Sequence, residues 1–101
     1  RRVIIGDSMS EIEDAIREIE SCEEIARQYE YTRQGARALE TLRQMKDLLK
    51  NPTKENIDQC ISMIEMGEEA LSSHRYMSVV DEFLSHLSKA KEYLRKAAEK
   101  L

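Results

Sequence analysis

The chain has 101 residues, of which 36% are charged and 41% hydrophobic, and its formal net charge at pH 7 is −4. This length allows one core and no second domain. Net negative charge disfavours a nucleic-acid partner, and no apolar run approaches the roughly 18 residues of a membrane span or reads as a signal peptide. We therefore expect neither a nucleic-acid nor a membrane partner and, by default, a cytoplasmic location.

The chain contains an internal repeat, because residues 8–51 align with residues 53–96 at a shift of 45 positions. Eleven of the 44 aligned pairs are identical, and their first-copy members are Ile12, Ile16, Ile19, Glu20, Glu23, Glu24, Tyr31, Leu39, Leu42, Lys46 and Leu49. Such self-similarity indicates two copies of one supersecondary unit. We predict an N-terminal arm at 1–7 and a single helical domain at 8–101, made of repeat unit 1 (8–51) and repeat unit 2 (53–101).

Each unit begins with a residue suited to cap a helix. Ser8 precedes Glu11 by three positions, which is the spacing of a capping box. Its counterpart Thr53 follows Asn51 and Pro52, a pair that ends one helix and separates the two units. We expect helices to start at Ser8 and at Thr53.

Apolar residues then recur every three or four positions, as on the buried face of an amphipathic helix. They are Ile12, Ile16, Ile19, Cys22 and Ala26, then Ala38, Leu39, Leu42, Met45 and Leu49 in unit 1, and Ile57, Ile61, Ile64, Gly67 and Leu71, then Val80, Phe83, Leu84, Leu87 and Leu94 in unit 2. Both units lose this rhythm at the same place, around 28–32 and 73–77, where the next core positions, Gly35 and Val80, follow nine residues after Ala26 and Leu71. The repeated break predicts two helices in each unit.

We therefore predict an all-α fold, an antiparallel four-helix bundle made of two αα-hairpin repeats with a period of 45 residues. The alternative is a hairpin of two very long helices whose one turn is Asn51-Pro52, because residues 28–34 contain no proline to end a helix.

The charge pattern favours four helices. The net charge is −7 over residues 7–30, +3 over 31–50, −4 over 51–73 and +2 over 74–101, so acidic and basic segments alternate. Glu13 and Lys46 are equidistant from the first turn, as are Asp58 and Lys91 from the second. We expect both to form ion pairs that contribute little energy but specify which helices pack together.

No catalytic, cofactor-binding or metal-binding motif appears in the sequence. The repeated acidic triplets, Glu20/Glu23/Glu24 and Glu65/Glu68/Glu69, lack the Glu-x-x-His spacing of di-metal bundles and indicate solvated acidic faces. Cys22 and Cys60 have no metal-ligand spacing, so we expect reduced core residues. We expect no enzyme activity and no cofactor.

Five candidate binding residues fall at the two predicted turns, which lie at one end of an up-down-up-down bundle. They are Tyr29, Tyr31, His74, Arg75 and Tyr76. Tyrosine and arginine are favoured anchors of protein interfaces. We predict a surface for a partner protein or for a second copy of the chain, with His74 and Arg75, which have no identical counterpart in unit 1, as the stronger candidates. The alternative is that Tyr31 and Tyr76 cap the hairpin core.

Gly67, Tyr76 and Phe83 resemble part of the tetratricopeptide-repeat signature, with a small residue in the first helix and an aromatic residue both after the turn and in the second helix. In unit 1, Cys22 and Ala38 match the two helical positions and Tyr31 matches the residue after the turn. The resemblance implies a helical-repeat fold, although the period of 45 residues differs from the family's period of about 34.

The segment Ile5-Gly6-Asp7-Ser8-Met9 is similar to the centre of a BH3 segment of the Bcl-2 family, in which an amphipathic helix docks into a groove. The upstream anchor position of that motif falls on Arg2. The resemblance implies a groove-binding segment that uses Ile5, Gly6, Asp7 and Met9. The alternative is a short apolar arm that covers the bundle.

Together these features predict a non-enzymatic protein-protein interaction or scaffold module. A second hypothesis is an engineered helical binder or scaffold, because Lys89–Leu101 is a helix-forming stretch of low complexity. The divergence between the two units argues against a fully idealised design.

Overall fold

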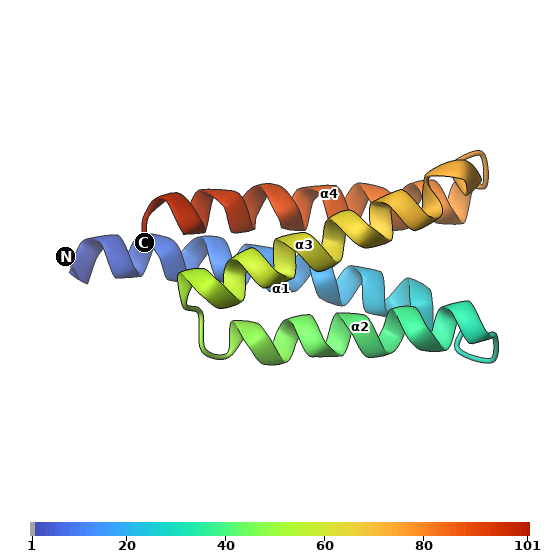
Figure 1. The fold of residues 1–101 in the computed structure, drawn as a ribbon, viewed down its shortest axis with the longest axis horizontal. Helices are drawn as coiled ribbons and strands as arrows, with labels where there is room; N and C mark the ends of the chain where they lie inside the picture. The colour runs from blue at the N-terminus through green and yellow to red at the C-terminus, as the bar shows by residue number, and fades with distance from the viewer. Residues whose placement is uncertain (1) are drawn as a thin grey trace.

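The computed structural model describes the backbone of residues 2–101 and the side chains of residues 9–101. Within these residues the chain forms α1 (Arg2–Arg27), α2 (Arg33–Leu49), α3 (Lys54–Leu71) and α4 (Ser78–Glu99), with a short 3₁₀ helix, η1 (Ser72–His74), before α4. The helices extend along the long axis of a molecule that measures 44 × 22 × 18 Å (Figure 1). None of these helices combines the length and the apolarity needed to traverse a lipid bilayer.

The predicted helix breaks near residues 30 and 75 are confirmed, and the alternative of two long helices is wrong. α1 ends at Arg27 and α2 begins at Arg33, while η1 and the residues after it separate α3 from α4. The α1–α2 and α3–α4 connections lie at one end of the molecule, and the α2–α3 connection lies at the other (Figure 1). The radius of gyration, 13.5 Å, is close to the value of about 13 Å for a compact domain of this length.

Each helix packs on neighbours of opposite net charge. The acidic helix α1 packs most extensively on α4 and also on α2, while the acidic helix α3 packs on α4 and α2. Neither the two acidic helices nor the two basic helices pack extensively on each other. The alternation of charge along the sequence thus becomes an alternation around the helix assembly, as predicted.

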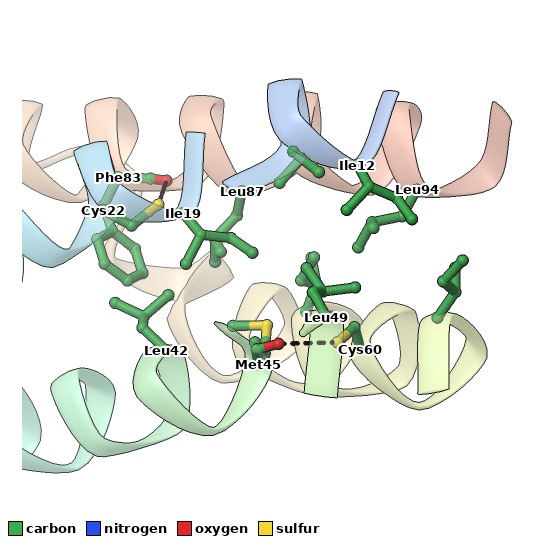
Figure 2. Close-up of a cluster of buried hydrophobic side chains, with 14 of the residues drawn as sticks. Ile12, Ile19, Cys22, Leu42, Met45, Leu49, Cys60, Phe83, Leu87 and Leu94 are labelled. Carbon is green, nitrogen blue, oxygen red and sulfur yellow. Dashed lines mark hydrogen bonds between the residues drawn. The ribbon is translucent and has the colours of Figure 1, made fainter. Parts of the chain in front are cut away.

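One core of aliphatic and sulfur-containing side chains fills the space between the helices (Figure 2). Its most completely buried large members are Ile12, Ile19, Leu42, Met45, Ile57, Ile64, Leu84, Leu94, Cys22 and Cys60. Full burial of one such aliphatic side chain stabilises a fold by roughly 1.5–3 kcal/mol. The predicted stripes missed Ala15, Ala90 and Ala97, which are fully buried. Alanine also favours helices at exposed positions, so its presence alone does not mark a buried face.

The predicted cap at Thr53 is confirmed, and the predicted helix start at Ser8 is wrong. Thr53 Oγ1 accepts a hydrogen bond from the Asn56 amide at 3.1 Å. α1 begins at Arg2, within the segment expected to form an arm, so Ser8 lies inside the helix. A capping side chain does not end a helix that continues upstream without a proline. Thr32 caps α2, where its Oγ1 accepts from the Gly35 amide at 3.0 Å.

Gly35 and Gly67 form a matched pair for a test of the packing at the first turn. A Cβ atom built on Gly35 would clash with the backbone carbonyl oxygen of Tyr29, so we expect Gly35→Ala to lower the free energy of unfolding by about 1–3 kcal/mol. A Cβ atom on Gly67 meets only Leu87 Cδ1, at 3.7 Å. We expect Gly67→Ala to raise that free energy by about 0.5–1 kcal/mol, because alanine favours a helix interior. Urea denaturation followed by circular dichroism measures both, and equal effects would contradict the close approach at Gly35.

Candidate functional site

The first turn, residues 28–32, is held by short hydrogen bonds within its own backbone. The Tyr29 amide donates to the Ala26 carbonyl at 2.9 Å, and the Thr32 amide donates to the Tyr29 carbonyl at 2.9 Å. The Thr32 hydroxyl donates to the same carbonyl at 2.7 Å. In this frame the rings of Tyr29 and Tyr31 stack, with centroids 6.5 Å apart and planes at 25°.

The second turn follows α3 and is built from η1 and residues 75–77. The Met77 amide donates to the His74 carbonyl at 3.0 Å. The rings of His74 and Tyr76 stack, with centroids 6.4 Å apart and planes at 26°. Arg75 Nε donates to Asp81 Oδ1 at 2.8 Å, so this guanidinium is engaged by a carboxylate of α4.

The two stacked ring pairs occupy equivalent positions of the repeat. A shift of 45 residues carries Tyr29 onto His74 and Tyr31 onto Tyr76, and the ring geometries agree closely. His74 therefore does have a counterpart in unit 1, although the residue type differs. The backbone of each turn, rather than the ring chemistry, sets this arrangement.

The second ring of each stacked pair, Tyr31 or Tyr76, is exposed to solvent. Tyr31 and Tyr76 are each 82% exposed, while Tyr29 and Met77 are about half as accessible at 39% and 42%. Rings this exposed do not cover the core, so the alternative in which Tyr31 and Tyr76 cap the hairpin core is wrong. They instead present flat apolar faces with a hydroxyl at the edge, the combination enriched at protein interfaces.

The five predicted residues share one end of the molecule but divide into two groups. Figure 1 places both turns at the same end. Among the described side chains, each ring contact stays within its own turn. The site is therefore a pair of aromatic turns, defined as residues 28–32 and 72–77.

The structure also contains a repeated Glu–Lys–Glu cluster that links the two helices of each unit. Lys46 Nζ lies 2.9 Å from Glu23 and 3.3 Å from Glu20. Lys91 Nζ lies 2.6 Å from Glu68 and 4.0 Å from Glu65, the residues one repeat later.

The predicted partners of these lysines, Glu13 and Asp58, are wrong. Asp58 instead pairs with Lys54 of the same helix. Side chains tilt towards the N-terminus of their own helix, so Lys46 reaches back towards the turn and meets carboxylates that lie closer to it. Counting residues from the turn ignores this tilt.

Glu23 is buried, so the predicted solvated acidic face is wrong at this position. Its side chain is 7% exposed, and its hydrogen bond to Lys46 raises the pKa of that ammonium above its ordinary value. The sequence signal that could have found Glu23 is its position four residues after Ile19 and one after Cys22, at the edge of the buried stripe. These carboxylates serve as partners of lysine within the fold.

The two cysteines are buried and reduced, as predicted. Cys22 Sγ donates to the Phe83 carbonyl at 3.6 Å, and Cys60 Sγ donates to the Met45 carbonyl at 3.5 Å, so each thiol joins two helices (Figure 2). Burial, with the nearby Glu18 and Glu23 charges, raises the pKa of Cys22 to about 12, and burial raises that of Cys60 to about 11. Protonated, buried thiols are poor nucleophiles and poor metal ligands.

An open groove of about 350 Å³ lies between α2 and α3, away from the aromatic turns. It is lined by Gln44, Asp47, Leu48, Asn56, Gln59 and Met63. Asn56 is already committed to the backbone, because its Nδ2 donates to the carbonyls of Leu48 and Asn51. The remaining lining brings together no group suited to catalysis.

The BH3-like segment falls mostly outside the described side chains. Ile5, Gly6 and Asp7 lie in the helical backbone of α1, but their side chains are not among those described. Met9, the last of the four residues, is 39% exposed.

Comparison with protein-family models, with curated proteins and with solved structures finds no match.

Removing Lys46 should destabilise the fold more than removing its repeat counterpart. Lys46→Met leaves the buried Glu23 carboxylate without its cation, and we expect a loss of about 1–3 kcal/mol in the free energy of unfolding. Lys91→Met leaves Glu65 and Glu68, which are 48% and 25% exposed and remain partly hydrated, so a smaller loss is expected. Urea denaturation measures both variants. Adding Glu23→Leu to Lys46→Met should recover stability, and failure to do so would contradict the role given to the buried carboxylate.

Alkaline pH should weaken the fold through the two thiols. Their folded pKa values, about 12 and about 11, exceed the ordinary value of 9.0, so the folded state retains protons that the unfolded chain loses. This stabilisation is complete below pH 9 and is lost as the pH rises through the folded values. Denaturant unfolding at pH 7, 9 and 10.5 should show a decline that the Cys22→Ala/Cys60→Ala variant shows less steeply. Parallel declines in the two proteins would contradict this assignment.

Proposed function

We propose that the chain is a non-enzymatic protein-interaction module, formed by two αα-hairpin repeats in an antiparallel four-helix bundle. In this proposal the bundle is the scaffold and the two aromatic turns are the binding surface. The partner is another protein, and a second copy of the chain is the alternative occupant.

The observation that carries the proposal is the exposure of two stacked ring pairs at one end of the molecule. Tyr31 and Tyr76 each expose 82% of their surface. Water contact with these rings is unfavourable, and burying them against a partner would remove it. Tyrosine also keeps its hydroxyl available for a hydrogen bond at an interface edge.

The turns also reduce the cost of ordering the rings on binding. Tyr31 already stacks on Tyr29, and Tyr76 on His74. Each turn is also held by backbone hydrogen bonds, such as Tyr29 N–H to the Ala26 carbonyl and Met77 N–H to the His74 carbonyl. A side chain that is ordered before binding loses less conformational entropy when the complex forms. The same rings on a mobile loop would bind more weakly.

The test compares capture by the wild-type chain with capture by the Tyr31→Ala/Tyr76→Ala variant. Proteins retained by the immobilised wild type would be identified by crosslinking and mass spectrometry, and the strongest would be purified for calorimetry. We expect the variant to weaken binding about tenfold or more, because truncation of a central tyrosine typically costs more than 1 kcal/mol. We expect its melting temperature to stay unchanged, since the removed rings lie outside the core.

Met66→Ala serves as the matched control, because Met66 is 70% exposed but lies on α3, away from the turns. His74→Ala/Arg75→Ala tests the second turn alone. A fall in melting temperature with unchanged partner binding would show that the turns are structural. Sedimentation of the wild type from micromolar to millimolar concentration tests the alternative occupant, and a dimer abolished by the tyrosine variant would identify it as a second copy.

A further inference from the structure

The arginines of this chain divide into paired and unpaired sets. Among the side chains from Met9 onward, those with a carboxylate within 4.0 Å are Arg17, Arg75 and Arg95. Those without one are Arg27, Arg33, Arg37 and Arg43. All unpaired arginines of the described part therefore lie in residues 27–43, around the first aromatic turn and on α2.

Three of these arginines lie next to the first turn in the chain. Arg27 is the last residue of α1 and Arg33 is the first residue of α2, so they bracket the turn. Arg37 follows Arg33 by four positions, which places both on one face of α2. All three are exposed. We name Arg27, Arg33 and Arg37 the arginine cluster.

The second turn shows that the arginine cluster is not needed to build the turn. A shift of 45 residues places Ser72, Ser78 and Glu82 at the three arginine positions. The stacked rings of the second turn nevertheless have almost the same spacing and inclination. The arginines therefore add charge to a geometry that forms without them.

Their position is also unfavourable for the helix that carries them. The first turn of α2 contains no acidic residue and begins with Arg33. The N-terminal end of a helix has a partial positive charge, which repels a guanidinium and attracts an anion. A bound carboxylate would relieve this repulsion, and no carboxylate of the described side chains lies within 4.0 Å of the Arg33 guanidinium.

We infer that the arginine cluster and Tyr31 recognise an acidic peptide segment of the partner protein, in which a hydrophobic residue is followed by carboxylates at alternate positions. This inference rests on the proposed function and names the chemistry of its partner. Arg33 and Arg37 lie about 6 Å apart along the helix axis. Alternate residues of an extended peptide are about 6.6 Å apart, so their carboxylates match the two guanidiniums.

The same register carries the hydrophobic residue to the exposed tyrosine. In an extended peptide, residues i, i+2 and i+4 project from one face. When the two peptide carboxylates bind Arg33 and Arg37, the peptide residue two positions before the first carboxylate lies towards Tyr31. Tyr31 precedes Arg33 in the chain by two residues. Guanidinium groups bind carboxylates through two parallel hydrogen bonds, which fixes this register.

A short acidic peptide fits the charge of the molecule better than a nucleic acid does. The segment 7–30, most of which belongs to α1 and packs beside α2, has a net charge of −7. A long polyanion that extended beyond the turn would meet this acidic surface and be repelled. A peptide of a few residues is confined to the arginine cluster.

The test uses a fluorescein-labelled peptide, Gly-Phe-Ser-Glu-Ser-Glu-Gly, and follows its anisotropy as protein is added in 50 mM NaCl. We expect saturable binding that Arg33→Gln/Arg37→Gln weakens at least tenfold and Tyr31→Ala weakens at least threefold. The matched control is Lys89→Gln/Lys96→Gln, which changes the net charge from −4 to −6 as the arginine variant does. Both lysines are exposed on α4, so this control should alter binding less than twofold.

Four outcomes would overturn the inference. They are no saturable binding of the peptide by the wild type, equal losses of affinity in the two charge variants, equal affinity for a peptide with adjacent glutamates, and tighter binding of a ten-residue oligothymidylate.

Capture of the partner protein by the aromatic turns provides a separate test. If the Tyr31→Ala/Tyr76→Ala variant no longer captures that partner but the Arg33→Gln/Arg37→Gln variant still does, the acidic-peptide inference fails and the proposed function stands. If neither variant affects its capture, the proposed function itself fails.

Discussion

The structure depends on the burial of one apolar stripe from each of four helices in a single shared core. The stripes are aliphatic, and their most buried members, such as Ile19 and Leu94, have no solvent exposure. Because no helix can bury its stripe alone, each needs two neighbours, and the connections must bring the four stripes to face one another. Helices of opposite net charge are neighbours in this arrangement, since α1 and α3 each pack beside α2 and α4.

This constraint also explains why the aromatic turns are exposed. The stripes end before residues 28–32 and 72–77, where the apolar rhythm breaks and the chain must reverse. Residues in these turns lie beyond the end of the core, so their rings have no apolar surface to fill. Their conformation is nevertheless held by the helix ends on either side, through hydrogen bonds such as that from Thr32 to the Tyr29 carbonyl. An aromatic residue in the turn of a well-packed helical hairpin is therefore both held in place and exposed.

The alignment of residues 8–51 with residues 53–96 allows features of one segment to be compared with those of the other. Lys46 and Lys91 each contact two glutamates at aligned positions, Glu20 and Glu23 or Glu65 and Glu68. The turns preserve ring geometry but differ in charge, and Gly35 has a bulkier counterpart in Val80. Some core positions keep one residue type in both units, as at Ile12 and Ile57, whereas others differ, as at Met45 and Ala90. The charge difference between the two turns is where different binding properties can arise.

Much of this architecture was predictable from local sequence. The number of helices, the breaks near residues 30 and 75, the cap at Thr53 and most core positions follow from periodicity and from capping chemistry, which act over a few residues. The start of α1 was not predictable in this way, because Ser8 is a suitable cap that the helix nevertheless continues past. The burial of Glu23 and its pairing with Lys46 also required the packed structure, since side-chain tilt and the height of one helix against another decide them.

For this protein the sequence alone determined that the chain is built of amphipathic helices, most of the positions they bury and which charges each segment carries, because these follow from the order of residues along one helix. Only the tertiary structure excluded two long helices in favour of four. Only the tertiary structure decided how exposed the turn rings are, which carboxylates each lysine meets and which arginines remain without a partner. Those properties depend on distances between residues far apart in the chain. They are set when the core closes and brings the helices to fixed positions.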